Sequence, residues 1–239
     1  MKKVILILLL LLFVVGCGRS ENEIILATEA GFAPYEYYEN GEIVGIDIDI
    51  AKEVAKELGK ELVIKDIAFD SIINEVKTGK SDFAAAGISY TKERGKAVLF
   101  SINYVDSKQV VVVRNDSSIN SSSDLKNAKI AVQLGSVADT YVTSEYKKAE
   151  IIRQKKYLTT IQDLEDGKVD CVVMDELPAL EILKTKSNMR ILEKPLVTDS
   201  YGIIVRKSNE ELLEVINKVI KRMQDDGSLN ESILRHTSK

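Results

Sequence analysis

Short apolar runs alternate with amphipathic stretches along most of the chain. Residues 23–28 form an apolar run of strand length. Ile50, Val54 and Leu58 then recur at a spacing of four, which places their side chains on one face of a helix. Gly59 follows directly and predicts the end of that helix, because glycine readily adopts the left-handed conformation found there. Alternating strands and helices predict an α/β fold with largely parallel sheets.

The same alternation returns in the second half of the chain, which indicates two similar units. The predicted strands cover residues 23–28, 62–64, 83–86, 110–113, 129–132, 150–153, 169–174 and 201–205. The predicted helices cover residues 47–58, 71–78 with Asp70 as N-cap, 137–146, 160–166, 178–184 and 209–224. A mature chain of roughly 220 residues suits two lobes better than one. We expect the chain to cross between them near residues 105–108 and 198–201.

The N-terminus has the pattern of an export signal. Two lysines precede an apolar run over residues 4–15, which is too short for a comfortable membrane span. The run ends in a stretch that resembles the bacterial lipobox, in which Cys17 is acylated and becomes the new N-terminus. We therefore expect a signal peptide over residues 1–16 and a palmitate-bearing, lipidated tether over residues 17–22. The alternative is a buried or incidental cysteine.

Composition narrows the function classes. The net charge is −4, with both signs scattered along the chain, which argues against a nucleic-acid partner or a polybasic membrane surface. Apart from Cys17 the only cysteine is Cys171, in an apolar run, so we expect a core residue and no intramolecular disulfide. The sequence contains no metal-ligand cluster, phosphate loop or heptad repeat.

Arg94 lies in the first turn of a predicted helix, a position at which a positive charge is unfavourable without an anionic partner. An apolar run ends in Gly87 and Ser89 before Thr91, which predicts a helix N-cap. Arg94 therefore falls in a first turn, where a positive charge opposes the helix dipole. Free N–H groups, the Ser89 hydroxyl and the guanidinium would together hold a small carboxylate. The alternative is a solvated surface arginine.

Asp175 ends an apolar strand in the second unit. A carboxylate there is partly desolvated and needs a cation, from the fold or from a ligand. The alternative is that Asp175 caps the helix that begins near Pro178. Because ligands of open α/β sheets bind beyond the carboxyl ends of the strands, Asp175 and Arg94 are expected at one cleft. A small zwitterion would bridge the two units through both charges and favour their closure.

Other residues that directly follow predicted strands are expected at the same carboxyl-end edge of the sheets. Gln133, Gly135 and Ser136 follow a predicted strand, and the glycine allows a close approach of the backbone. Phe32 and Phe69 leave strands of the first unit. An ordinary core position is the alternative for both, but the adjoining turn residues favour the rim of a cleft.

A series of motifs runs through the chain in a fixed order. They are Gly45-Ile46-Asp47-Ile48-Asp49-Ile50, Gly79-Lys80-Ser81-Asp82, residues 87–94, Phe100-Ser101, Asn103-Tyr104, Gly135-Ser136, Val169-Asp170 and Asp175-Glu176. This order resembles the bacterial extracellular solute-binding proteins of family 3, the polar amino acid receptors of ABC importers. The resemblance implies a two-lobed periplasmic-binding-protein-like fold (type II), each lobe a mixed sheet flanked by helices, with a two-segment hinge. It divides the chain into lobe 1 (23–107), lobe 2 (108–198) and a return to lobe 1 (199–239).

The resemblance also implies roles for individual positions. Arg94 would hold the ligand α-carboxylate with Ser89 and the Gly87 backbone, and Asp175 would hold the α-ammonium group. The remaining implied contacts are Phe32 and Phe69 on either side of the ligand side chain, Glu29 and Gln133 at its polar end, and Gly135 and Ser136 in a second-lobe loop.

Glu29 limits the side chain of the ligand. Its carboxylate accepts hydrogen bonds from an amide or pairs with a cation, so glutamine, arginine, lysine and histidine are allowed. An apolar side chain would leave it unpaired at a cost of about 1–3 kcal/mol. Two positions depart from the family pattern: Val137 stands where a polar residue commonly grips the carboxylate, and Ala86 replaces a serine of the basic amino acid receptors. We expect basic and amide side chains first.

The predicted function is the substrate-binding component of an amino acid ABC importer. Its expected partners are a free L-amino acid, a permease and its ATPase subunit, with no cofactor, catalytic residue or metal ion. We expect a monomer outside the cytoplasm, in the periplasm or at the cell surface, anchored through Cys17. One alternative is an arogenate or prephenate dehydratase of the same fold, with Asp175 or Glu29 as acid, since the only histidine, His236, lies in a polar tail. Another is a ligand-sensing surface lipoprotein.

Overall fold

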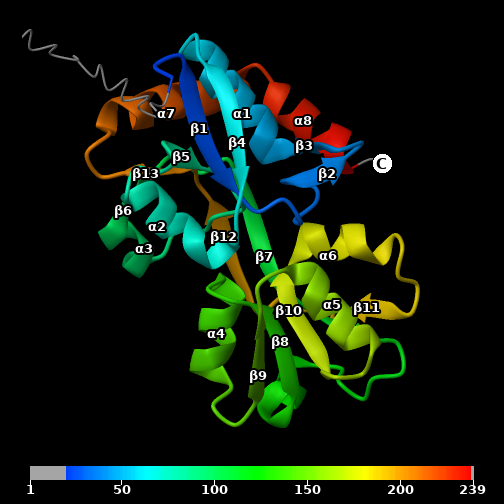
Figure 1. Cartoon of the computed structure of the whole chain (residues 1–239). Coiled ribbons are helices and arrows are strands. Elements are labelled where there is room, and N and C mark those ends of the chain that lie inside the picture. The colour runs from blue at the N-terminus through cyan, green and yellow to red at the C-terminus, as the bar shows by residue number, and fades with distance from the viewer. Residues whose placement is uncertain (1–19, 238–239) are drawn as a thin grey trace, which may run out of the picture.

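Two separate sheets organise the chain in the computed structural model, which describes residues 20–237 (Figure 1). The first sheet has the strand order β4–β1–β5–β13–β6. Its strands are β1 (Glu23–Thr28), β4 (Glu61–Asp66), β5 (Phe83–Ala84), β6 (Val98–Phe100) and β13 (Ile204–Arg206). The associated elements are the hairpin β2 (Tyr37–Glu39) and β3 (Glu42–Val44), the 3₁₀ turn η1 (Phe69–Ser71), and helices α1 (Ile46–Glu57), α2 (Ile72–Lys77), α3 (Lys92–Ala97), α7 (Glu210–Asp225) and α8 (Ser228–Thr237).

The second sheet has the order β11–β7–β10–β8–β9, with β12 paired to β7. Its strands are β7 (Val105–Arg114), β8 (Lys129–Gln133), β9 (Glu150–Gln154), β10 (Cys171–Asp175), β11 (Met189–Ile191) and β12 (Val197–Tyr201). The helical elements are the 3₁₀ turn η2 (Ser122–Asn127), α4 (Val137–Glu145), α5 (Tyr157–Glu165) and α6 (Glu176–Leu183). Both sheets are mixed, because β13 is antiparallel to β5 and β6, and β7 is antiparallel to β10, β11 and β12.

Two long strands connect the sheets. β7 and β12 pair from Val105 opposite Tyr201 to Gln109 opposite Val197, and Figure 1 shows them running together from one sheet towards the other. The segments expected as crossings, 105–108 and 198–201, lie in this antiparallel ribbon. Because few other elements join the two halves of the chain, a rotation of one half against the other would concentrate in the ribbon.

The helix pattern on the C-terminal side is confirmed. Asn209 caps α7 by accepting a hydrogen bond from the backbone of Leu212 at 3.3 Å. The apolar positions Leu212, Ile216 and Ile220, at a spacing of four, are buried in the core that includes residues of the first sheet and α1. Cys171 is fully buried in the second core, as expected of a small apolar residue.

Several local predictions were wrong. The stretch 201–205 is not one strand, since β12 ends at Tyr201 and β13 begins at Ile204 in the other sheet. The Gly202 amide between them donates to the carbonyl of Ile88 at 3.0 Å, where the chain changes sheets. Asp70 does not cap α2: it lies within η1, and Ser71 occupies the N-cap position without a side-chain bond.

Two helices begin earlier than predicted. α5 begins at Tyr157 and α6 begins at Glu176, ahead of the expected starts near residues 160 and 178. Pro178 misplaced the second start, because proline is tolerated throughout a first turn, where its missing N–H would be unsatisfied anyway.

The expected polar tail is a helix. α8 returns along α1, and Ser232, Arg235 and His236 all donate or bond to Oδ2 of Asp49 at 2.6, 2.8 and 2.9 Å. His236 is buried there and also contacts the Tyr37 hydroxyl at 2.9 Å. The predicted signal peptide, Cys17 and the start of the tether lie outside the described residues. Within residues 20–237, we find no helix long and apolar enough to cross a bilayer.

Candidate ligand-binding site

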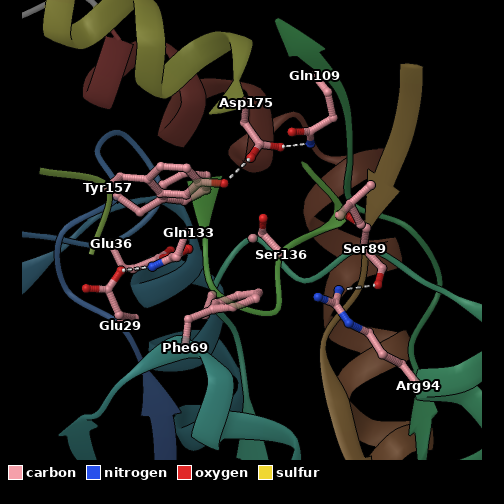
Figure 2. A pocket seen from close by; sticks show the side chains of 14 residues that line it. Glu29, Glu36, Phe69, Ser89, Arg94, Gln109, Gln133, Ser136, Tyr157 and Asp175 are labelled. Carbon is pink, nitrogen blue, oxygen red and sulfur yellow. Dashed lines mark hydrogen bonds between the residues drawn. The ribbon is translucent and has the colours of Figure 1, made fainter. Parts of the chain in front are cut away.

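A pocket lies between the two sheets, where the carboxyl ends of several strands meet (Figure 2). The segments around the first sheet supply residues after β1, in η1, after β5 and in α3. The segments of the second sheet and its helices supply residues from β7, the β8–α4 turn, α5 and the end of β10. The lining residues are Glu29, Phe32, Glu36, Phe69, Ala86, Gly87, Ser89, Arg94, Gln109, Gln133, Ser136, Val137, Tyr157 and Asp175.

The structure brings the sequence-predicted residues together. All of them except Gly135 line this pocket. Gly135 lies directly beside it, in an adjoining groove, and its carbonyl accepts a hydrogen bond from Nη2 of Arg94 at 2.9 Å. Arg94 and Asp175, which leave different sheets, therefore face one shared space.

Local sequence places Arg94. Thr91 caps α3 as predicted, accepting from the Arg94 amide at 3.1 Å. The guanidinium donates to the carbonyls of Ser89 at 2.7 Å and Gly135 at 2.9 Å, and it lies 5.4 Å from the centre of the Phe69 ring. Burial lowers the pKa of Arg94, an effect that nearby Asp199 opposes. Its hydrogen-bond acceptors among residues 20–237 are carbonyls, so no carboxylate neutralises it directly.

Asp175 is held by neutral donors. Its Oδ1 accepts from Ser107 at 2.9 Å, from Gln109 at 2.7 Å and from the Tyr201 hydroxyl, and the Tyr157 hydroxyl lies 3.5 Å from Oδ2. Burial raises the pKa of Asp175 to about 6, and Asp199 adds to this rise. Asp175 occupies the N-cap position of α6 but makes no capping hydrogen bond. The carboxylate therefore points to the pocket rather than to the helix.

The opposite end of the pocket is acidic. Oε2 of Glu29 accepts from Gln133 at 3.2 Å, and Nζ of Lys156 lies 3.9 Å from Oε1. Burial raises the pKa of Glu29 to about 7. Glu36 is buried behind it and contacts Asp47, and burial followed by repulsion from Asp47 holds the pKa of Glu36 well above its usual range. A cationic group at this end would relieve the desolvation of these carboxylates.

Aromatic rings form the walls. Phe32 stacks on Tyr157 at 5.2 Å between ring centres, so a ring from each half of the chain meets across the pocket. Gly87 beside them has φ +54°, and a Cβ there would lie 2.7 Å from the Phe32 ring. The Gly87 amide donates to Asp47 at 2.9 Å, so this N–H already has a partner.

Sequence reasoning missed Glu36, Gln109 and Tyr157 as lining residues. Tyr157 stands at a helix start that the pattern placed three residues later. Gln109 precedes the apolar run 110–113, and its polar side chain at that border was the one available signal. Glu36 follows the Phe32 loop, and no periodicity distinguishes it from a surface acid.

Two mixed α/β units joined by a paired-strand ribbon, with a polar pocket between them, define a two-lobed solute receptor of the type II periplasmic-binding-protein fold. A family model for bacterial extracellular solute-binding proteins, family 3, matches residues 24–238, and the chain belongs to that family.

Similar proteins agree with this placement. The chain is 31% identical over 234 residues to "ABC transporter arginine-binding protein 1" of Escherichia coli, covering 95% of this chain and 96% of that protein. A mutant of ArgBP from T. maritima has a TM-score of 0.88 and 37% identity, covering 91% of this chain and 96% of that one. An ancestral arginine-binding protein bound to glutamine has a TM-score of 0.86 and 36% identity, covering 92% and 100%. These relatives are solute-binding proteins rather than enzymes.

Proposed function

We propose that this chain captures an L-amino acid with a basic or amide side chain and delivers it to the permease of an ABC importer, which an ATPase subunit drives. The observation that carries the proposal is the position of Arg94 and Asp175. Arg94 reaches the pocket from α3 beside the first sheet and Asp175 from the end of β10 in the second, and within residues 20–237 the hydrogen bonds that hold them come from neutral groups. An α-amino acid carries the complementary carboxylate and ammonium on a single carbon.

The contacts of the pocket divide into three regions. Arg94, with Ser89 and the loop at Gly135 and Ser136, surrounds the place of the α-carboxylate. Asp175 receives the α-ammonium group. For the side chain, Phe32 and Phe69 supply apolar faces, and Glu29 with Gln133 supplies the polar end. Gly87 serves as a close backbone neighbour rather than as an N–H donor.

The buried acids favour a cation at the side-chain end. Glu29 is 2% exposed, and Oε1 has no hydrogen bond among the described residues. Glu36 and Asp47 lie buried behind it and repel each other's negative charge, so a nearby cation would favour the ionised form of both. We therefore place arginine ahead of glutamine, in line with the names of the relatives, and keep the amide because Gln133 and Glu29 together offer both a donor and an acceptor.

Closure of the two lobes would couple binding to delivery. The ribbon of β7 and β12 links lobe 1 (residues 23–107 and 199–239) to lobe 2 (residues 108–198). A ligand that contacts both lobes stabilises the closed state by its differential affinity for that state. The remaining expectations belong to the same proposal: a signal peptide, a lipid on Cys17, a monomer outside the cytoplasm, and no enzymatic activity. His236 is engaged by Asp49 and Tyr37 and does not line the pocket.

A thermal-shift screen against the proteinogenic amino acids, followed by calorimetry, tests the proposal. We expect a dissociation constant of about 1 μM or below, which corresponds to about −8 kcal/mol. Arg94→Ala should abolish binding, and Asp175→Asn should weaken it severely. Near-normal affinity in either variant would contradict the assigned roles. Incubation with arogenate or prephenate provides the contrasting test, since formation of phenylalanine or phenylpyruvate would favour an enzyme.

A further inference from the structure

A lysine stands at the rim of the pocket, against its buried acid. Lys156 is the N-cap residue of α5, and its Nζ lies 3.9 Å from Oε1 of Glu29. Glu29 follows β1 of the first sheet, whereas Lys156 follows β9 of the second, so the pair spans the pocket. The Lys156 side chain is 51% exposed and that of Glu29 is 2% exposed. The lysine therefore reaches the acid from the solvent side.

Glu29 presents one carboxylate oxygen to this lysine. Its other oxygen, Oε2, accepts from Gln133 at 3.2 Å. Oε1 is buried and has no hydrogen-bond partner among residues 20–237. Burial raises the pKa of Glu29, and the Gln133 bond and then the charge of Lys156 oppose that rise. Lys156 thus acts electrostatically on the carboxylate that a ligand side chain would approach.

We propose that Lys156 is a specificity-determining residue that lowers the preference of the pocket for cationic side chains relative to neutral ones. The inference rests on the proposed function. A guanidinium or ammonium group approaching Glu29 is repelled by Lys156 and replaces it as the counter-ion. An amide avoids that repulsion, since its NH₂ group donates to the carboxylate while its oxygen accepts from the lysine. Because Lys156 is half exposed, it moves into water at small cost, so it adjusts selectivity without excluding cations.

The neighbouring lysine provides a matched control. Lys155 has the same charge and is exposed. Within the described residues, the ion pair of Glu29 is with Lys156 and not with Lys155. Its backbone carbonyl accepts from Gln133 at 3.1 Å, a contact that a side-chain substitution leaves in place. Lys155→Gln therefore removes the same charge from the same surface without touching the acid.

The test is calorimetry with L-arginine and L-glutamine on the full chain and on Lys156→Gln, Lys156→Glu and Lys155→Gln. Measurements at about pH 8.5 keep Glu29 ionised, so proton uptake does not obscure the comparison. We expect the preference for arginine over glutamine to rise about fivefold in Lys156→Gln and further in Lys156→Glu, as for a half-exposed charge pair. Lys155→Gln should change it less than about twofold at physiological salt.

A second background separates this role from a structural one. In Glu29→Gln protein, the additional change Lys156→Gln should raise the arginine-to-glutamine preference less than it does in the wild type, since only the direct repulsion between the lysine and the cation remains and the competition for the Glu29 carboxylate is gone. An unchanged preference in Lys156→Gln, or an equal change in Lys155→Gln, would overturn the inference while wild-type binding still supported the proposed function. Failure of the wild type to bind any amino acid would overturn both.

Discussion

Arginine affinity should fall steeply as the pH decreases from about 8 to about 5. In the empty pocket, burial raises the pKa of Glu29 to about 7 and the pKa of Asp175 to about 6. A cationic ligand binds the ionised forms of both, so protonation competes with binding. The sign is therefore fixed: affinity is full at about pH 8 and above, and it is lost as the pH falls through these two values.

The magnitude follows from the two pKa values. At pH 5, the ionised fraction of Glu29 is lower by about a hundredfold and that of Asp175 by about tenfold. Arginine, which needs both carboxylates, should lose up to about a thousandfold in affinity. Glutamine needs only Asp175 as an anion, because a protonated Glu29 still forms hydrogen bonds with an amide, so its loss should be about tenfold.

Calorimetry at several pH values measures both curves, and repetition in buffers of different ionisation enthalpy counts the protons released. Glu29→Gln is the control, since it should reduce the pH dependence of arginine binding to that of glutamine. Asp199, Glu36 and Asp47 also have a raised pKa, but all three remain in Glu29→Gln, so the difference between the wild-type and Glu29→Gln curves for arginine isolates Glu29. Parallel curves for arginine and glutamine in the wild type would refute the reasoning.

Three further changes have defined outcomes. Glu29→Gln should remove a pH-dependent penalty in the empty protein: burial raises the pKa of Glu29 to about 7, so wild-type unfolding free energy, measured by urea denaturation, falls by up to about 3 kcal/mol between pH 5 and 8. Gly87→Ala should lower the melting temperature and weaken binding, whereas Gly41→Ala, also at positive φ but with open space around it, should cost only about 1 kcal/mol. Tyr201→Phe removes a donor to Asp175 and should cost about 1–3 kcal/mol of stability with a smaller loss of affinity than Asp175→Asn.

The sequence was sufficient where local chemistry decides the structure. Thr91 as an N-cap fixes the start of α3 and thereby the place of Arg94, and Asp175 was recognisable because it ends a continuous apolar strand. Both signals are contained within a few neighbouring residues, so they survive without knowledge of the tertiary structure. The rule that ligands bind beyond the carboxyl ends of the strands then predicted one shared cleft for both residues, and the family resemblance added the two-lobed topology that contains it.

The missed residues depend on register and on long-range pairing. Gln109 contacts Asp175 because β7 and β10 pair antiparallel with these two residues opposite each other, and no local pattern specifies that register. Lys156 lies near Glu29 because the start of α5, which packs on the second sheet, lies opposite the loop that follows β1. The polar residues of the C-terminal helix suggest a tail in the sequence. The helix packs because partners such as Asp49, which bonds to His236, lie in a distant segment that the local pattern does not reveal.

The neutral support of the two key charges explains how an empty receptor tolerates them. A direct ion pair between Arg94 and Asp175 would have to be broken by each ligand, at the cost of leaving two buried charges unpaired. Instead, two backbone carbonyls hold Arg94 in position, and hydroxyls with a side-chain amide hold Asp175. A ligand need not displace these hydrogen bonds. The raised pKa of Asp175 shows that these dipoles do not offset its desolvation completely. The ammonium group of an amino acid pairs with Asp175 while its carboxylate pairs with Arg94. The same two ion pairs therefore stabilise both the bound ligand and the closed arrangement of the lobes.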